Sequence, residues 1–402
     1  MHNDQIIYIS FDRFPAPKGA ATHISYFTEA LGRKFGSVDL VTLMGHEEFD
    51  PPKLPGVTHH PLPAIGDNMI TRSISFRAEL GLWWKHRKPK VVHVRSIYEG
   101  YPIAIRKNQL CDYFIYEANG FPSVELKFHH PNVDNDDVLM KKILHQEDKC
   151  LKEADLIITV SEVNAQFIRD RGIDPNKILV IPNGVDIDVF KWKAPEFDDS
   201  SPLRLIYSGT MTKWQGVHHA IEAAQLYSKD YPVKLTLAGP CKYKERKLIF
   251  RSIDRLKMND FVEVIGPVKQ KELVKLLHLS DVALAPLPAN DRNLEQGCCP
   301  LKVLEAMAAG TPVISSDIPV VQELAENSKE AILVRPSSAK AIKDGLLELK
   351  KNQNLFMELS VAARARIEKD FQWSRATNQL IKAYNPFMNS ERRKDLEVPP
   401  NN

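Results

Sequence analysis

The chain has 402 residues, of which 43% are hydrophobic and 26% charged, with a formal net charge of +3 and a pI near 8.4. No apolar run approaches the roughly eighteen residues that a membrane-spanning helix needs, so we expect a soluble protein. The charge is too slight for the basic stripe of a nucleic-acid-binding protein, which excludes that class of partner. One hydrophobic core rarely serves a chain of this length, and we therefore expect two domains.

The amino terminus and the cysteines indicate a cytoplasmic protein. Met1 to Asp4 lead directly into an apolar run, without the basic segment or the cleavage site of a secretory signal. The five cysteines are sparse and odd in number, which excludes a disulfide framework, and their spacing fits no zinc site. We expect free thiols, no metal and no cofactor.

Apolar segments of strand length alternate with helix-length segments along residues 1–192, which is the pattern of a parallel sheet. We expect this first domain to be Rossmann-like and to contain strands at residues 6–10, 38–43, 91–94, 113–116, 156–160 and 178–181.

The polar, proline-containing segment 193–202 interrupts this alternation and predicts an interdomain connection. The alternation resumes in a second domain, residues 203–370. A closing helix at 371–388 is expected to pack back on the first domain, followed by a mobile tail at 389–402. The expected strands of the second domain are 205–208, 235–238, 262–265, 282–285, 313–315 and 331–334.

The segment Gly297–Asp317 predicts a helix that faces a phosphate and leads into a buried strand. Pro300 suits the start of a helix and Gly310 its end. The free N–H groups of the first turn, together with Lys302, suit an anion. From the residues alone, an ordinary surface ion pair of Lys302 with Glu305 is equally plausible.

Two further loops follow strands and carry small residues. Gly19 and Ala20 follow the first strand and could donate N–H groups to a phosphate, although a tight turn explains them as well. Gly209 and Thr210 hold the corresponding place in the second domain. Because ligands of such sheets bind at the carboxyl ends of the strands, these loops should face a common cleft.

Together these segments resemble retaining glycosyltransferases of the GT-B fold, the glycogen synthase-like and mannosyltransferase-like "glycosyl transferases group 1". The family signature Glu-x7-Glu ends in Leu-Glu-Ala-Met-Ala-x-Gly-x-Pro-Val, which residues 304–313 match. The Gly19 loop, the segment 182–186 and the closing motif 371–373 also resemble the family. The resemblance implies an α/β fold of two Rossmann-like, doubly wound parallel-sheet domains facing across a cleft.

The resemblance also implies the reaction. A hexosyl group passes from a nucleoside diphosphate sugar, a UDP or GDP sugar, to a hydroxyl acceptor with retention of configuration and without a metal ion. The acceptor could be a glycan, a lipid-linked molecule or a small molecule. A nucleotide-sugar epimerase of the same architecture and a non-catalytic nucleotide-sugar-binding protein remain alternatives. A dinucleotide-dependent oxidoreductase is disfavoured because neither half carries Gly-x-Gly-x-x-Gly after its first strand.

The resemblance implies three groups of site residues: catalytic, acceptor-side and donor-binding. By resemblance Glu305 holds the ribose, while Lys302, Glu305 and Asn119 are the catalytic candidates. The acceptor-side candidates are His23, Arg95 and Asn119, none of which matches a metal motif. The donor-binding candidates are Gly19, Ala20, Gly209, Thr210, Lys213, Gln215, Cys298, Cys299, Pro300, Leu301, Lys302 and Glu305.

The chain departs from the family pattern at three positions. Thr210 stands where the family has arginine, Gln215 where it has lysine, and Gly297 where it has the first glutamate. We expect Lys302 and Lys213 to supply the missing charge.

Two other motifs have less specific readings. Asp186 and Asp188 match the metal-binding Asp-x-Asp of another architecture, but a turn at a strand end explains them better. Phe76, Leu80, Trp83 and Trp84 fall at helical spacing beside basic residues. This spacing fits peripheral contact with a membrane surface, but it is more typical of a core helix.

Overall fold

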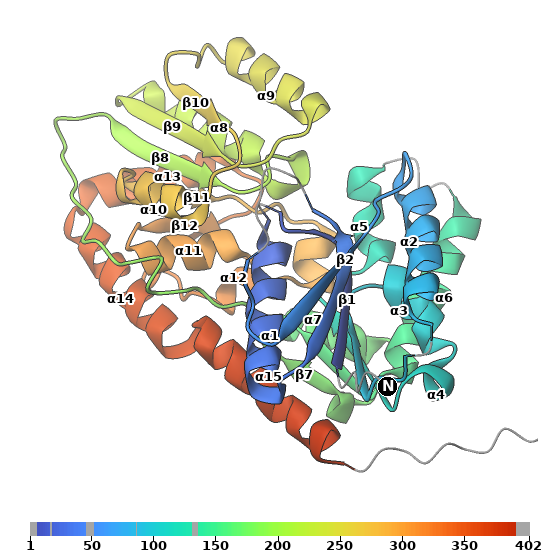
Figure 1. Ribbon diagram of the computed structural model, residues 1–402. Coiled ribbons are helices and arrows are strands. Elements are labelled where there is room, and N and C mark those ends of the chain that lie inside the picture. Colours follow the sequence, from blue (N-terminus) through green and yellow to red (C-terminus); the bar gives the residue numbers. More distant parts are fainter. Residues whose placement is uncertain (1–5, 17, 46–51, 86, 131–135, 391–402) are drawn as a thin grey trace, which may run out of the picture.

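The computed structural model describes residues 6–16, 18–45, 52–85, 87–130 and 136–390. They form two domains, each built on a parallel sheet with helices on its faces (Figure 1). The strand orders are β3-β2-β1-β4-β5-β6-β7 in the first sheet and β10-β9-β8-β11-β12-β13 in the second. The prediction of two doubly wound parallel sheets is confirmed, whereas the predicted tail lies almost wholly outside the described residues.

Most strands of the first domain are buried apolar segments, whereas β3 and β7 at the two edges of the sheet are largely half-buried or exposed. The strands are β1 (Ile6–Phe14), β2 (Val38–Met44), β3 (Val57–Leu62), β4 (Val91–Val94), β5 (Tyr113–Ala118), β6 (Leu156–Thr159) and β7 (Ile178–Val180). The helices are α1 (Gly19–Phe35), α2 (Met69–Trp83), α3 (Ile97–Ala104), α4 (Lys107–Leu110), α5 (Pro122–His129), α6 (Asp137–Glu153), α7 (Glu162–Asp170) and the short η2 (Pro175–Lys177). The sequence did not predict the edge strand β3.

The second domain repeats this plan. Its strands are β8 (Leu203–Ser208), β9 (Val233–Ala238), β10 (Val262–Ile265), β11 (Val282–Ala285), β12 (Val313–Ser316) and β13 (Ile332–Val334). Its helices are η3 (Lys213–Gln215), α8 (Val217–Ser228), α9 (Tyr243–Arg255), α10 (Gln270–His278), η4 (Arg292–Gln296), α11 (Leu301–Ala309), α12 (Pro319–Gln322), α13 (Ala339–Lys351) and α14 (Asn354–Asp370).

The last helix, α15 (Trp373–Asn389), returns to the first domain and packs on α1 (Figure 1). The ring of Trp373 stacks on that of Tyr26 with centroids 4.7 Å apart. Tyr384 is fully buried, and its hydroxyl lies 2.6 Å from Nδ1 of His93 on β4. These contacts give the first domain part of its core from the far end of the chain.

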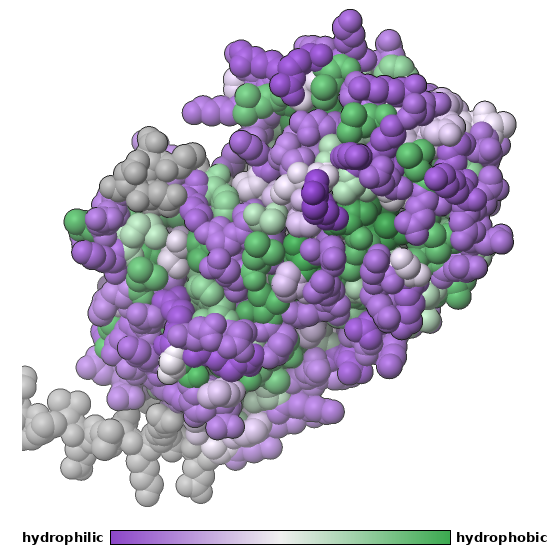
Figure 2. Space-filling view, turned by 180° about the vertical axis from the view of Figure 1, so that it is seen from behind, coloured by the Kyte–Doolittle hydropathy of each residue, from purple (hydrophilic) through white to green (hydrophobic). Residues whose placement is uncertain are grey.

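The apolar stripe of α2 belongs to the core. Phe76, Leu80 and the following Trp84 are buried, and the guanidinium of Arg87 lies over the ring of Trp83. The core reading of this stripe is therefore confirmed. On the face of the molecule in Figure 2, hydrophilic residues predominate and hydrophobic ones form scattered groups. Among the described residues, no helix combines the length and the apolar character needed to cross a bilayer.

Candidate functional site

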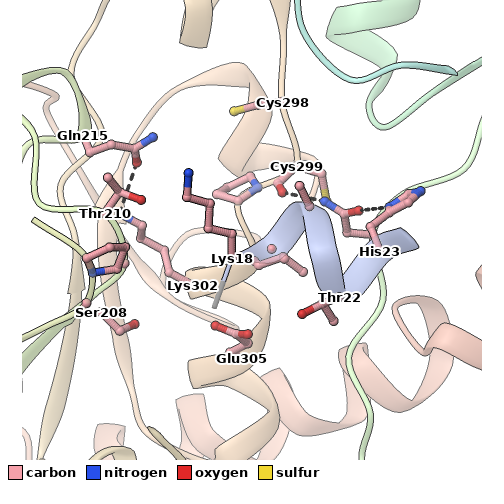
Figure 3. Close-up of a pocket in the computed structure, with 18 of the residues that line it drawn as sticks. Lys18, Thr22, His23, Ser208, Thr210, Gln215, Cys298, Cys299, Lys302 and Glu305 are labelled. Carbon is pink, nitrogen blue, oxygen red and sulfur yellow. Dashed lines mark hydrogen bonds between the residues drawn. The ribbon is translucent and has the colours of Figure 1, made fainter. Parts of the chain in front are cut away.

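A cavity of about 590 Å³ lies between the two domains, at the carboxyl ends of their strands. Figure 3 shows Thr22 and His23 on α1 and Lys302 and Glu305 on α11 around this space. Ser208 closes β8 and Arg95 follows β4, and both side chains line the cavity. This is the location at which open parallel sheets bind ligands.

The structure brings nearly all of the predicted site residues together here. Lys213 is the exception, because it lies on the short helix η3 with an exposed side chain and does not line the cavity. The predicted residues that do line the cavity are Gly19, Ala20, His23, Arg95, Asn119, Gly209, Thr210, Gln215, Cys298, Cys299, Pro300, Leu301, Lys302 and Glu305.

The N-termini of two helices meet at this cavity. Helix α1 begins at Gly19 and helix α11 at Leu301, with Pro300 in the N-cap position. A Cβ atom on Gly19 would lie 2.7 Å from Cδ1 of Leu301, so the two domains touch at this point. Gly310 ends α11 with a φ of +89°, a conformation that favours glycine. Because α1 and α11 both begin at the cavity, the positive ends of both helix dipoles face it.

Lys302 reaches Gln215, one of the two positions at which this chain lacks the cations of the family pattern. Its Nζ donates to the Tyr207 hydroxyl at 3.1 Å and to Oε1 of Gln215 at 3.2 Å. A Cβ on Gly209 would lie 3.3 Å from the same Nζ. Lys302 forms no ion pair with Glu305 among the described contacts, so the reading as a surface ion pair is wrong. The ammonium group instead lies beside the side chain that replaces the family's lysine.

The environment of α11 shifts the protonation of both of its polar side chains. Burial, and to a lesser extent the charge of Arg292, lowers the pKa of Lys302 to about 7. Burial raises the pKa of Glu305 to about 8, although the charge of Lys302 opposes this shift. Both groups are therefore poised to change charge near neutral pH, and a bound anion would favour the ammonium form of Lys302.

A single buried carboxylate organises the first-domain side of the cavity. Glu117, at the end of β5, is fully buried. Its Oε2 accepts a hydrogen bond from the Tyr8 hydroxyl at 2.7 Å and lies 2.9 Å from Nε2 of His93. Burial raises the pKa of this carboxyl, but neighbouring positive charges and hydrogen bonds hold it well below its usual range. The carboxylate form is thus built into the core.

Three predicted acceptor-side residues surround the other oxygen of Glu117. Nε of Arg95 donates to Oε1 at 2.9 Å, Nε2 of His23 lies 3.0 Å from it, and Nδ2 of Asn119 also donates to it. Arg95 additionally pairs with Asp12 at 2.7 Å, as expected for a structural ion pair. Oδ1 of Asn119 is buried and has no partner among the described residues, which leaves it free to accept from a ligand hydroxyl.

A chain of polar contacts links this side to the second domain. Nδ1 of His23 lies 2.9 Å from Oδ1 of Asn183, and Nδ2 of Asn183 donates to the carbonyl of Cys299 at 3.0 Å (Figure 3). Cys299 and Cys298 are buried free thiols, and burial raises the pKa of both. They therefore remain thiols in the cavity wall.

Sequence reasoning missed Arg292, which lines the cavity from η4. Its Nε donates to Oε1 of Glu125 at 2.8 Å, across the domain boundary, and its guanidinium lies 5.0 Å from the centre of the Trp214 ring. With Lys302 it gives the cavity two partly buried cations on the second-domain side. No motif marks Arg292, because its place depends on how η4 folds against α5.

The packing around Gly297 is incompatible with the first glutamate of the family pattern. Its φ is +87°, and a Cβ there would lie 2.4 Å from the amide nitrogen of Asn164 and 2.7 Å from Oγ of Ser161. The chain at this position is pressed against the start of α7 in the first domain. A glutamate side chain has no room at residue 297.

The Asp-x-Asp segment forms a turn. Oδ1 of Asp186 accepts from the backbone N–H groups of Asp188 and Val189, and its Oδ2 accepts from the Tyr26 hydroxyl. Within the described part of the chain, no group of three or more His, Cys, Asp or Glu side chains is arranged to hold a metal ion.

Fold and site together define a two-domain α/β protein with a cavity between its domains that is lined by cationic side chains and two helix N-termini. The family described as "Glycosyl transferases group 1" matches residues 188–366, and "Glycosyltransferase Family 4" matches residues 17–189. The chain is 25% identical to glycogen synthase of Mycobacterium tuberculosis over 84% of this chain and 78% of that protein. It is 26% identical to the amylovoran biosynthesis glycosyltransferase AmsK of Erwinia amylovora over 63% of this chain and 61% of that protein, less than two thirds of its length.

Solved structures share the fold. Sucrose-phosphate synthase from Thermosynechococcus elongatus superposes with a TM-score of 0.79 at 18% identity, over 95% of this chain and 98% of that one. Anabaena HepE in complex with UDP superposes with a TM-score of 0.71 at 15% identity, over 95% of this chain and 100% of that one. The chain belongs to the group 1 glycosyltransferases and has the GT-B architecture. It is accordingly an enzyme of the glycosyltransferase class.

Proposed function

We propose that the enzyme transfers a hexosyl group from a nucleoside diphosphate sugar to a hydroxyl acceptor, with retention of configuration and without a metal ion. The observation that carries this proposal is the position of Lys302, whose ammonium lies between Tyr207, Gln215 and Gly209 in the interdomain cavity. The donor diphosphate lies there, at the N-termini of α1 and α11, and Glu305 binds the ribose.

Charge supports the assignment of the diphosphate. Lys302 and Arg292 are partly buried cations on the cavity wall. Arg292 is paired with Glu125, whereas Lys302 has no carboxylate partner among the described contacts and costs free energy unless an anion accompanies it. The charge that builds up on the leaving diphosphate is stabilised by these side chains and by the helix dipoles, which are already in place before reaction. In this proposal protein cations do the work that a divalent ion does in other enzymes. HepE, which was solved with UDP, shows that this fold accommodates such a ligand.

The distribution of acidic groups supports retention without a protein base. Glu305 is the one carboxyl among the described residues that line the cavity, and it lies on the donor helix α11. The bond from the anomeric carbon to the phosphate oxygen breaks, and the acceptor oxygen forms its bond on the same face. The acceptor proton passes to the departing phosphate oxygen. Asn119 orients a sugar hydroxyl through its unpartnered Oδ1 and takes no proton.

Binding and turnover test this proposal separately. Isothermal titration calorimetry with UDP, GDP and ADP should identify one tightly bound diphosphate, and the matching sugar nucleotides should release that diphosphate when an acceptor is present. Proton NMR of the product should show the donor's anomeric configuration, and rates should persist in EDTA. Inversion of configuration would overturn the retaining mechanism, and loss of activity in EDTA would overturn metal independence. The absence of nucleotide binding would overturn the assignment of the donor.

A further inference from the structure

A second cavity, of about 610 Å³, opens on the first domain. It lies beside the interdomain cavity, which we call the donor cavity because we assign the donor to it. It is a groove between α2 and α6, with α3 packed against both helices. Its walls include Met69, Ile70 and Ile74 from α2 and Leu139 and Ile143 from α6. Ile70 and Ile74 are 53% and 61% exposed, although each side chain would favour burial. We call this feature the α2–α6 groove.

The α2–α6 groove lies beside the interdomain cavity, as two pairs of neighbouring residues show. Arg95 lines the donor cavity, and Ile97, two residues further along, lines the groove. On α5, Glu125 binds the cavity residue Arg292, and the next residue, Leu126, lines the groove. Both pairs of neighbouring residues place the groove next to the interdomain cavity on the side where Arg95 lies.

One lysine of the second domain borders the groove, and Asp136 is the one carboxyl among the described residues that line it. Lys244 of α9 lines it, although α9 belongs to the second domain. Residues 242–257 contain seven Lys and Arg against two Asp and Glu. None of these cations forms an ion pair with a residue in the described part of the chain. Helix α9 lies at the top of the molecule in Figure 1, where the surface in Figure 2 is mostly hydrophilic.

We propose that the acceptor is an anionic amphiphile whose apolar part occupies the α2–α6 groove and whose charged group lies against α9. This inference rests on the proposed transferase function. Apolar walls select the alkyl part through burial, while the unpaired lysines and arginines select the negative charge. The adjacency to Arg95 brings the acceptor hydroxyl to the sugar. The groove thereby supplies the substrate class that the donor cavity alone does not define.

Octyl, decyl and dodecyl phosphate, each below its critical micelle concentration, serve as probes in calorimetry with the full-length chain. Affinity should rise about fourfold for each added methylene if the chain enters the groove. The neutral dodecyl glucoside should bind at least tenfold more weakly than dodecyl phosphate. An affinity that does not depend on chain length would overturn the inference.

Surface variants locate the site. Ile70→Asp with Ile74→Asp should weaken dodecyl phosphate at least tenfold, and Lys244→Glu with Lys247→Glu should abolish the preference for phosphate over glucoside. Val361→Asp and Lys351→Glu, equally exposed positions on α14 and α13, are the controls and should change neither value. Equal losses in the controls would overturn the inference.

A parallel titration with UDP and GDP separates the two proposals. If a nucleotide binds while alkyl phosphates do not, only the groove assignment fails. If alkyl phosphates bind in the groove but no nucleotide binds, the transferase proposal fails, and the groove is then no acceptor site.

Discussion

The charge on Lys302, and with it the charge of the interdomain cavity, depends on pH. Burial and the charge of Arg292 disfavour the ammonium form and lower the pKa of Lys302 to about 7. The ammonium form predominates below that pH, and the neutral amine predominates above it. A diphosphate requires the ammonium form, so its affinity should be greatest on the acidic side and fall as pH rises.

Calorimetry with the preferred nucleoside diphosphate between pH 6 and pH 9 measures this dependence. The dissociation constant should rise more steeply with pH for the native enzyme than for Lys302→Arg, whose guanidinium remains charged throughout and in which only Glu305, with a pKa raised to about 8, still titrates. Lys302→Ala should bind roughly tenfold to a hundredfold more weakly at pH 6.5, the equivalent of a lost charge-assisted hydrogen bond. Native affinity in the alanine variant would contradict the assignment of this residue.

Glu117 supports the acceptor side through its contacts with Tyr8, His93 and Arg95. Glu117→Gln removes a buried charge while its cationic partner Arg95 stays in place, so the free energy of unfolding should fall by about 3 kcal/mol. Urea denaturation provides the measurement. The control is Glu29→Gln, which breaks an ion pair with Arg33 on the surface of the same domain and should cost less than about 1 kcal/mol. Similar costs for the two variants would argue against a supporting role for Glu117.

Among the secondary-structure elements, the sequence predicts best the strands in which apolar residues predominate. The strands β4, β10 and β11 match their expected bounds. Strand β11 is a continuous buried apolar run, as is typical of parallel strands, while β4 and β10 each contain a single polar residue, His93 and Glu263. Strand β3 was missed, since its histidines and Pro61 interrupt the apolar run at the sheet edge. Helix α11 was predicted from Pro300 and Gly310, and the structure bears out its location.

The site was predictable where it depends on local sequence and not where it depends on tertiary contacts. The loops at Gly19 and Gly209 follow strands and were found. The contacts of Glu117 come from separate strands and a helix, so no spacing in the sequence reveals them. Arg292 is positioned by Glu125 in the other domain.

Gly297 tests how tightly the segment before α11 is held against α7. A Cβ at this position meets the backbone of Asn164, and alanine disfavours a φ of +87°. Gly297→Ala should therefore destabilise the protein by more than about 2 kcal/mol and reduce turnover. Gly81→Ala on α2 is the control, because its added methyl group meets no atom within 4 Å, and it should be neutral or stabilising. Thermal unfolding of the two variants decides between these outcomes.

At the scale of the whole molecule, the two domains are joined by polar contacts beside the cavity. The carboxylate of Glu323, in the second domain, accepts from the backbone N–H groups of Glu162 and Val163, each at 2.9 Å, at the start of α7. It thus satisfies helix donors that the first domain leaves unpaired. Lys127 of α5 also forms an ion pair with Asp291. Such contacts fix the separation of the domains while the cavity stays accessible.

Glu323→Ala should loosen this connection, because the N-terminus of α7 then loses both of its acceptors from the second domain. We expect faster hydrogen exchange at residues 161–164 and a larger radius of gyration by small-angle scattering in the absence of ligand. A nucleoside diphosphate that contacts both domains should reverse the expansion, since it binds the closed arrangement preferentially. Glu326→Ala removes an exposed carboxylate that pairs with Lys329 inside the second domain, and it should leave both readouts unchanged. Identical exchange and scattering in the two variants would show that Glu323 does not set the domain arrangement.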